Sequence, residues 1–101
     1  MLVYDVAAKV HILDVTETNP YSKMEILEDE VSNANHESCT DDFTNLNTTY
    51  LDDAIQWDGL KDGDIININF HLVVHFFYDS MTGEWDAEWD ITKIKQEKVE
   101  A

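Results

Sequence analysis

The chain has 101 residues, 44% of them hydrophobic, which is enough for a single domain with one hydrophobic core. It carries 22 Asp and Glu residues against six Lys and no Arg, so its formal net charge is -16. Direct binding of nucleic acid depends on cationic side chains, above all on Arg, so this composition excludes a nucleic-acid-binding protein and favours a basic protein as partner.

The cellular location is predicted from three features of the chain. Cys39 is the single cysteine, so no intrachain disulfide can form and an oxidising compartment is not implied. Residues 1–15 lack the basic start and apolar run of a signal peptide, and no stretch reaches transmembrane length. We therefore expect a cytoplasmic protein that does not bind membranes. Lys without Arg, with frequent Asn and Thr, is typical of AT-rich genomes such as those of phages, and a phage-encoded protein would act in the host cytoplasm.

The amino-terminal stretch, residues 2–15, reads as a strand. Apolar residues occupy every second position at Leu2, Tyr4, Val6, Ala8, Val10 and Ile12. This period of two is typical of a strand with one face in the core. The alternation slips near Leu13 and Val15, so a bulge or the strand end is expected there.

The middle of the chain is predicted to contain two helices and a loop. Asn19 and Pro20 form a helix-start signal, and apolar residues then recur at helical spacing, which predicts a helix over residues 20–33. The competing interpretation is a strand that uses Met24 and Ile26. Residues 32–42 are polar and without apolar period, so a flexible loop is expected. A second, shorter helix is predicted over residues 48–57, where Thr49 and Asp52 resemble a capping box.

The carboxyl-terminal part has the clearest pattern, that of a long β-hairpin. Over residues 64–78 the alternating apolar positions are Ile66, Ile68, Phe70, Leu72, Val74, Phe76 and Tyr78. Residues 79–84 contain Gly83 and read as a turn, and alternation resumes over residues 85–94. If Tyr78 lies opposite Trp85, Glu88 lies opposite His75 and a surface charge pair between them is expected. Residues 96–101 are charged and are predicted to be a frayed tail.

These elements predict a single α+β domain over residues 1–101. Its antiparallel sheet would have three or four strands, with one or two helices over the apolar face. The order of the strands is not fixed by the sequence, because the first strand can pair beside either arm of the hairpin.

No constellation in the sequence points to catalysis, a metal or a cofactor. His71 and His75 lie about 13 Å apart if they are on a strand, which is too far for one metal ion. The acids and glycines of residues 58–64 fail the calcium-loop pattern, since Leu60 holds the third position. Cys39 has no base near it in sequence except His36. We therefore expect a protein that is not an enzyme and holds no metal or cofactor.

The acidic residues are the remaining candidate for function. Asp86, Glu88 and Asp90 alternate along one strand and would project from one side about 6.8 Å apart. A second group, Asp52, Asp53, Asp58 and Asp62, is expected near the other end of the hairpin. Over a domain with a diameter on the order of 30 Å the net charge amounts to about one per 2 Å, against about one per 1.7 Å for duplex DNA. The competing interpretation is a solvated surface that keeps the hairpin from aggregating.

In size, acidity, absence of Arg and ranked carboxylates, the chain resembles the nucleic-acid-mimic inhibitors of phages and mobile elements: the anti-CRISPR, anti-restriction and glycosylase-inhibitor proteins. The resemblance covers the whole chain and is one of composition, without a shared motif. It implies an inhibitor that blocks the nucleic-acid channel of a Cas effector, a restriction enzyme or a repair enzyme. The alternative is an oligomeric interaction or structural module, with Val73, Phe77 and Ile94 buried in a homodimer.

Overall fold

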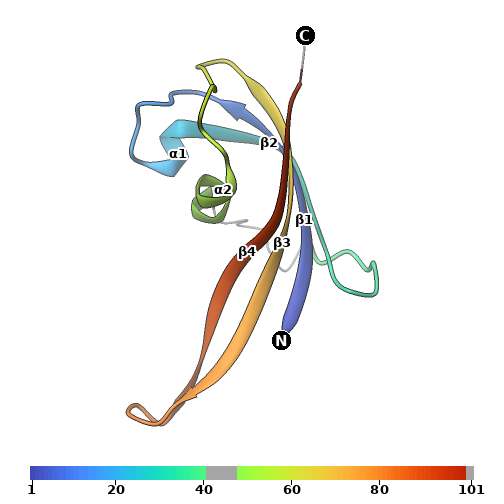
Figure 1. The fold of residues 1–101 in the computed structure, drawn as a ribbon, viewed down its shortest axis with the longest axis vertical. Helices are drawn as coiled ribbons and strands as arrows, with labels where there is room; N and C mark the ends of the chain where they lie inside the picture. The colour runs from blue at the N-terminus through green and yellow to red at the C-terminus, as the bar shows by residue number, and fades with distance from the viewer. Residues whose placement is uncertain (41–47, 100–101) are drawn as a thin grey trace.

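The computed structural model describes residues 1–40 and 48–99, and it is mostly sheet with two short helices (Figure 1). The elements are β1 (Leu2–Ile12), α1 (Pro20–Lys23), β2 (Met24–Ser32), α2 (Thr48–Ala54), β3 (Ile65–Asp79) and β4 (Glu84–Val99). The four strands form one sheet in the order β2-β1-β3-β4, and each neighbouring pair is antiparallel. This architecture is consistent with the predicted α+β class, and it places the first strand beside β3.

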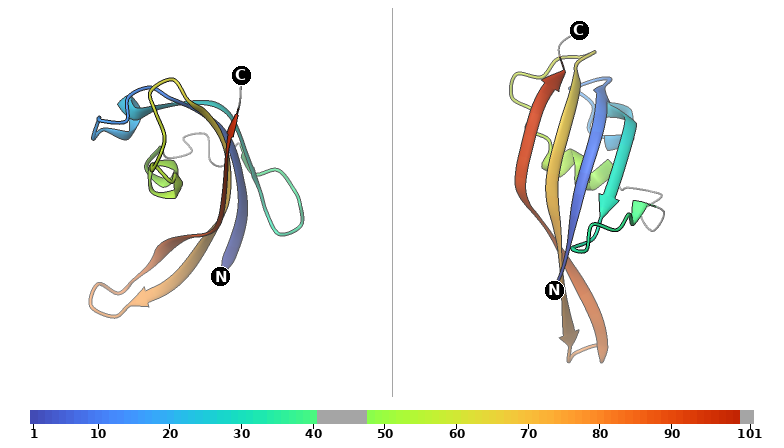
Figure 2. Two further views of the ribbon diagram at one scale, coloured as in Figure 1. Left: turned by 45° about the horizontal axis from the view of Figure 1, so that its top comes forward. Right: turned by 90° about the vertical axis from the view of Figure 1, so that its right-hand side faces the viewer.

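The hydrophobic core lies between the sheet and α2. We call the sheet face toward the helices the inner face and the opposite one the outer face. The sheet curves around α2, which sits in its hollow (Figure 2). The buried residues of the strands are Val6, Ala8, Val10, Ile12, Met24, Val31, Ile66, Ile68, Phe70, Leu72 and Val74, and α2 with the residue after it adds Leu51, Ala54 and Ile55. The alternation of β1 and β3 thus places one parity of each strand in the core.

The helix predicted over residues 20–33 is wrong in its extent. Its start is as expected, because the Asn19 side chain accepts a hydrogen bond from the Tyr21 amide at 3.0 Å and Pro20 follows at the first position. The helix ends at Lys23, however, and residues 24–32 form β2. Met24 and Ile26 lie opposite Ile12 and Val10 of β1. A helix would have left that edge of β1 without hydrogen-bond partners, so strand pairing prevails over the helical spacing.

Two further boundaries differ from the sequence prediction. The second helix ends at Ala54 and not at residue 57. The expected frayed tail over residues 96–101 is wrong for residues 96–99, which belong to β4, and residues 100–101 lie outside the described part. The expected loop is irregular over residues 33–40, where the Cys39 amide donates to the Val31 carbonyl at 2.7 Å. Residues 41–42 lie outside the described part.

A bulge in β4 changes which residues face the core. The pairing of β3 with β4 shifts between Asn69 and His71, and Lys93 has a φ of 53°, a value uncommon for a residue with a side chain. The extra residue reverses the alternation, so Ile91 before the bulge and Ile94 after it both pack against the core. Ile94 was expected at an exposed homodimer interface, and this placement is wrong.

The start of β3 is tied to the end of β1 through Asp64. Its carboxylate accepts a hydrogen bond from the Lys61 amide at 2.8 Å and lies 3.1 Å from the Lys98 ammonium group. Its backbone carbonyl accepts from the Ile12 amide at 2.8 Å. The Lys61 amide, followed by Lys98, lowers the pKa of Asp64 below its ordinary value of 3.8.

Asp64→Asn is therefore expected to lower the melting temperature near neutral pH by an amount that disappears in acid. A carboxylate with a lowered folded-state pKa stabilises the protein above its unfolded pKa, and this stabilisation is lost as pH falls through the folded value. Thermal unfolding followed by circular dichroism at pH values from 7 down to about 2 measures it. Asp53→Asn, at an exposed position of α2, is the control. A deficit that is the same at every pH would contradict the role given to the ionised carboxylate.

Candidate protein-binding surface

The β3–β4 pair extends beyond the rest of the sheet. β1 pairs with β3 only as far as Leu2 opposite Val74, so past this point β3 has no neighbour except β4. We call residues 75–88 the arm, and it projects from the body at one end of the molecule (Figures 1 and 2). At its tip the Gly83 amide donates to the Asp79 carbonyl at 2.8 Å, and Gly83 has a φ of 73°, which glycine adopts without steric cost.

The three predicted strand acids lie on the outer face, toward the projecting end. Asp86, Glu88 and Asp90 are exposed, and their cross-strand neighbours are Phe77, His75 and Val73 in that order. Directly opposed residues of an antiparallel pair project to the same side. The structure thus brings the three carboxylates together in one row, as their alternation predicts.

The three carboxylates differ in their surroundings. The Asp90 carboxylate lies 3.3 Å from Nε2 of His75. The Asp86 side chain accepts a hydrogen bond from the Ala87 amide at 2.8 Å. Glu88 lies opposite His75 in the predicted register, but the carboxylate that pairs with this histidine is that of Asp90, one position along the face.

The second group of predicted acids is divided between structural and exposed positions. The Asp52 carboxylate forms an ion pair with Lys23 at 2.9 Å, and both side chains are largely buried between the two helices. The Asp62 side chain accepts a hydrogen bond from the Val15 amide at 2.9 Å and so holds the loop before β3 against the one after β1. Asp53 and Asp58 are exposed. Asp52 and Asp62 therefore have a structural role, because their carboxylates already bind groups of the same chain.

Asp62 lies far from the row of strand acids. Asp62 comes three residues before the first residue of β3, whereas the strand acids lie opposite residues 73–77. Ten residues of strand separate positions 65 and 75, which is about 33 Å. The longest dimension of the molecule is 49 Å, so a partner that touched both Asp62 and the row would have to span most of its length.

Of the three residues predicted for a homodimer, two share the acidic face. Val73 is half-buried and Phe77 is 40% exposed, and they lie opposite Asp90 and Asp86. Ile94 faces the core and does not join them.

The inner face of the arm carries a surface that the sequence reasoning missed. Phe76, Tyr78, Trp85 and Trp89 project on this side and are all exposed; we call them the aromatic patch. Trp89 stacks on Tyr50 of α2 with ring centroids 5.6 Å apart, and Tyr78 meets Trp85 edge to face at 5.7 Å. The sequence held no signal for this exposure, because the strands predicted over residues 2–15 and 64–78 are nearly equal in length, whereas β1 has 11 residues and β3 has 15.

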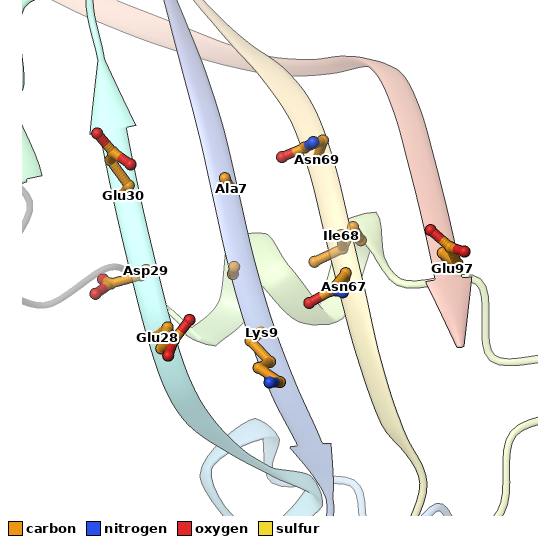
Figure 3. A pocket seen from close by; sticks show the side chains of 10 residues that line it. Ala7, Lys9, Glu28, Asp29, Glu30, Asn67, Ile68, Asn69 and Glu97 are labelled. Atoms are coloured by element: carbon orange, nitrogen blue, oxygen red, sulfur yellow. The ribbon is translucent and has the colours of Figure 1, made fainter. Parts of the chain in front are cut away.

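The outer face of the body holds a shallow groove of about 460 Å³. It lies over Ala7, whose small side chain leaves a hollow between larger neighbours (Figure 3). The charged and amide side chains around it come from all four strands: Lys9, Glu28, Glu30, Asn67, Asn69 and Glu97. Its mixed charges distinguish this groove from the arm, which contains no Lys.

Histidine–carboxylate pairs cross the outer face from strand to strand. Nδ1 of His11 lies 3.6 Å from a carboxylate oxygen of Glu25, and Nε2 of His71 lies 2.6 Å from one of Asp5. With the His75–Asp90 pair, each strand of the sheet is joined to its neighbour in this way. Sequence reasoning did not find these pairs, because the partners of His11 and His71 depend on strand order.

Within residues 1–40 and 48–99, no three potential metal-binding side chains come together. No helix in the same part of the chain has the length and apolar character needed to cross a membrane. The Cys39 thiol is half-buried and points to the Glu37 carbonyl at 3.6 Å.

Comparison of the chain with protein-family models, characterised proteins and solved structures finds no match.

Proposed function

We propose that this protein is a small acidic inhibitor that occupies the nucleic-acid-binding channel of a host defence enzyme: a Cas effector, a restriction enzyme or a repair enzyme. It would act in the cytoplasm of the host cell. The observation that carries the proposal is the exposed row of Asp86, Glu88 and Asp90 at the projecting end of the sheet. The net charge of -16 and the absence of Arg support it.

The mechanism follows from the spacing and the charge of this row. Alternate residues of an antiparallel strand lie about 6.8 Å apart, which is twice the axial spacing of about 3.4 Å between phosphates of one DNA strand. Lys and Arg side chains that line a channel for nucleic acid can therefore pair with these carboxylates in place of phosphates. The field of the whole protein accelerates association with a basic partner, and the fixed row gives the contact its register.

Replacing the row by neutral amides is expected to reduce capture of the target strongly. Asp86→Asn, Glu88→Gln and Asp90→Asn together remove three charges while keeping the size of each side chain. The natural protein, immobilised and exposed to a bacterial lysate, should retain a nucleic-acid-processing enzyme that elutes with salt and is displaced by added duplex DNA. The triple variant should retain much less of it.

The control for this experiment is the fold of the variant. All three positions are exposed, and removing like charges reduces self-repulsion, so the melting temperature should stay equal or rise. Equal capture of the same enzyme by both proteins would reject the assignment of the row.

The alternative function is an oligomeric interaction or structural module without mimicry. The observation in its favour is Phe77, which is 40% exposed on the acidic face although a purely electrostatic contact has no need of it. Sedimentation separates the two readings, since a dimer that persists at high salt favours the module and a monomer favours the inhibitor.

A further inference from the structure

The exposed large apolar side chains of the protein concentrate on and beside the arm. Trp85 is 72% exposed, Phe76 56%, Tyr78 55% and Trp89 39%. All four lie on the inner face. On this face, the alternate residues of β3 from Ile66 to Val74 are fully buried. The aromatic patch thus continues the core pattern past the end of β1, and at Trp89 it adjoins Tyr50 of α2.

The exposed apolar area of the aromatic patch is larger than that of single apolar residues on a protein surface. Whole aromatic side chains present about 150–250 Å² each, so these exposed fractions together amount to roughly 450 Å². Contiguous apolar patches of about 300–600 Å² are the largest found on typical monomers and are often functional. A two-stranded ribbon has little stability of its own in water. The arm therefore has the properties of an element that is completed by a partner.

The charge of the arm indicates which partner fits. Residues 75–88 contain no Lys or Arg, and their acids are Asp79, Glu84, Asp86 and Glu88. A second copy of the chain would bring a second such arm and a second net charge of -16 to the same place, and like charges oppose that association. These four acids all lie on the outer face of the arm, so a basic segment on the inner face meets the electron-rich faces of the rings, while the carboxylates attract it through the field of the arm.

The molecule itself contains an ammonium group on an indole ring, the kind of contact that such a segment would make. Nζ of Lys23 lies 4.5 Å from the centroid of the Trp57 ring, and the same ammonium group pairs with Asp52 at 2.9 Å. An ammonium group is thus held by an indole face and a carboxylate together. On the arm, Trp85 offers an indole ring on the inner face, whereas the adjacent Asp86 projects from the outer face, so a cation on Trp85 would be held by the ring without that carboxylate.

We propose that the aromatic patch is a docking surface for a basic, partly apolar segment of the partner protein, whose Arg or Lys side chains lie on the rings of Trp85 and Tyr78. The inference rests on the proposed function, because it takes the partner to be a basic protein, and it adds the face and the side chains that the partner must present. The partner contacts both faces of the arm: it binds the carboxylates of the arm on the outer face and the rings of the arm on the inner face.

The test uses the full chain and a fluorescently labelled synthetic peptide in which arginine alternates with leucine. A second peptide has citrulline, which is neutral and similar in shape, in place of arginine. Fluorescence anisotropy measures the affinity of each peptide for the natural protein, for Trp85→Ala and for Tyr78→Ala. Phe77→Ser is the matched control, since it removes a neighbouring aromatic residue from the outer face of the same arm.

We expect the arginine peptide to bind the natural protein more tightly than the citrulline peptide, and Trp85→Ala to weaken its binding about tenfold. Phe77→Ser should bind it like the natural protein. Unchanged affinity in both Trp85→Ala and Tyr78→Ala would overturn the proposal. It would also be overturned if the natural protein sedimented as a dimer that Trp85→Ala dissociates, because a second copy would then occupy the patch.

The triple amide variant of Asp86, Glu88 and Asp90 separates this inference from the proposed function. If that variant loses the arginine peptide while Trp85→Ala keeps it, the docking inference fails and the acidic row stands. If Trp85→Ala loses the peptide while the triple variant keeps it, the docking surface stands independently of the row, and capture of the target by the triple variant decides whether the row assigned to the inhibitor fails.

Discussion

Leu51→Ala is expected to lower the free energy of unfolding by about 2–5 kcal/mol, the range measured for leucine truncations in protein cores. Leu51 is completely buried and, with Ala54 and Ile55, attaches α2 to the inner face of the sheet. The helix has seven residues, too few to be stable in isolation, so it depends on this contact. A loss of this size is a large part of the roughly 5–15 kcal/mol that stabilises an ordinary domain.

Urea denaturation followed by circular dichroism measures the effect, with Asp53→Ala as control on the same helix. Asp53 is exposed, and substitutions at such positions change stability by about 0.5 kcal/mol or less. A loss below about 1 kcal/mol in Leu51→Ala would show that the cavity collapses or that α2 is not needed to cover the sheet.

The alternation of apolar and polar residues was sufficient to predict which residues of β1 and β3 are buried. In β1 and β3, the apolar positions from Val6 to Ile12 and from Ile66 to Val74 are the buried ones. These strands lie at the centre of the sheet, with one face in the core and the other in water, so the period of two is preserved along them.

The sequence failed where a non-local contact decides the structure. Residues 24–32 have apolar positions that fit both a helix and a strand, and the free edge of β1 selects the strand. The position of Ile94 was predicted wrongly because the bulge at Lys93 changes which residues of β4 face the core. The sequence has no Gly at this position that would indicate a bulge.

The candidate site likewise has one part that alternation within a strand predicts and another part that depends on non-local contacts. The row formed by Asp86, Glu88 and Asp90 depends only on alternation within one strand, and it was predicted. The arm and the aromatic patch depend on where β1 ends relative to β3, which is a property of the whole sheet. The roles of Asp52 and Asp62 depend on Lys23 and on the Val15 amide, which are distant in sequence.

Removal of the arm is expected to abolish binding of the target while leaving the fold intact. Residues 76–87 can be replaced by Asn-Gly, a pair suited to a two-residue turn, so that His75 is joined to its cross-strand neighbour Glu88. None of the removed residues belongs to the core cluster. The free energy of unfolding should therefore stay similar, and the shortened chain should be more soluble because it lacks Phe76, Tyr78 and Trp85.

Affinity for the target should fall by at least about a hundredfold, because central aromatic residues and buried charge pairs account for most of the binding energy of an interface. The deletion removes Asp86 from the acidic row together with Phe76, Tyr78 and Trp85 from the aromatic patch, so this loss should exceed that of Trp85→Ala alone. A shortened chain that folds and binds the target like the natural protein would contradict the docking surface and a contribution of Asp86. It would leave the contact to Glu88 and Asp90 or to the body of the molecule, where Asp53 and Asp58 are exposed. A larger loss in the triple amide variant than in the shortened chain would instead show that Glu88 and Asp90, which the deletion keeps, carry most of the contact.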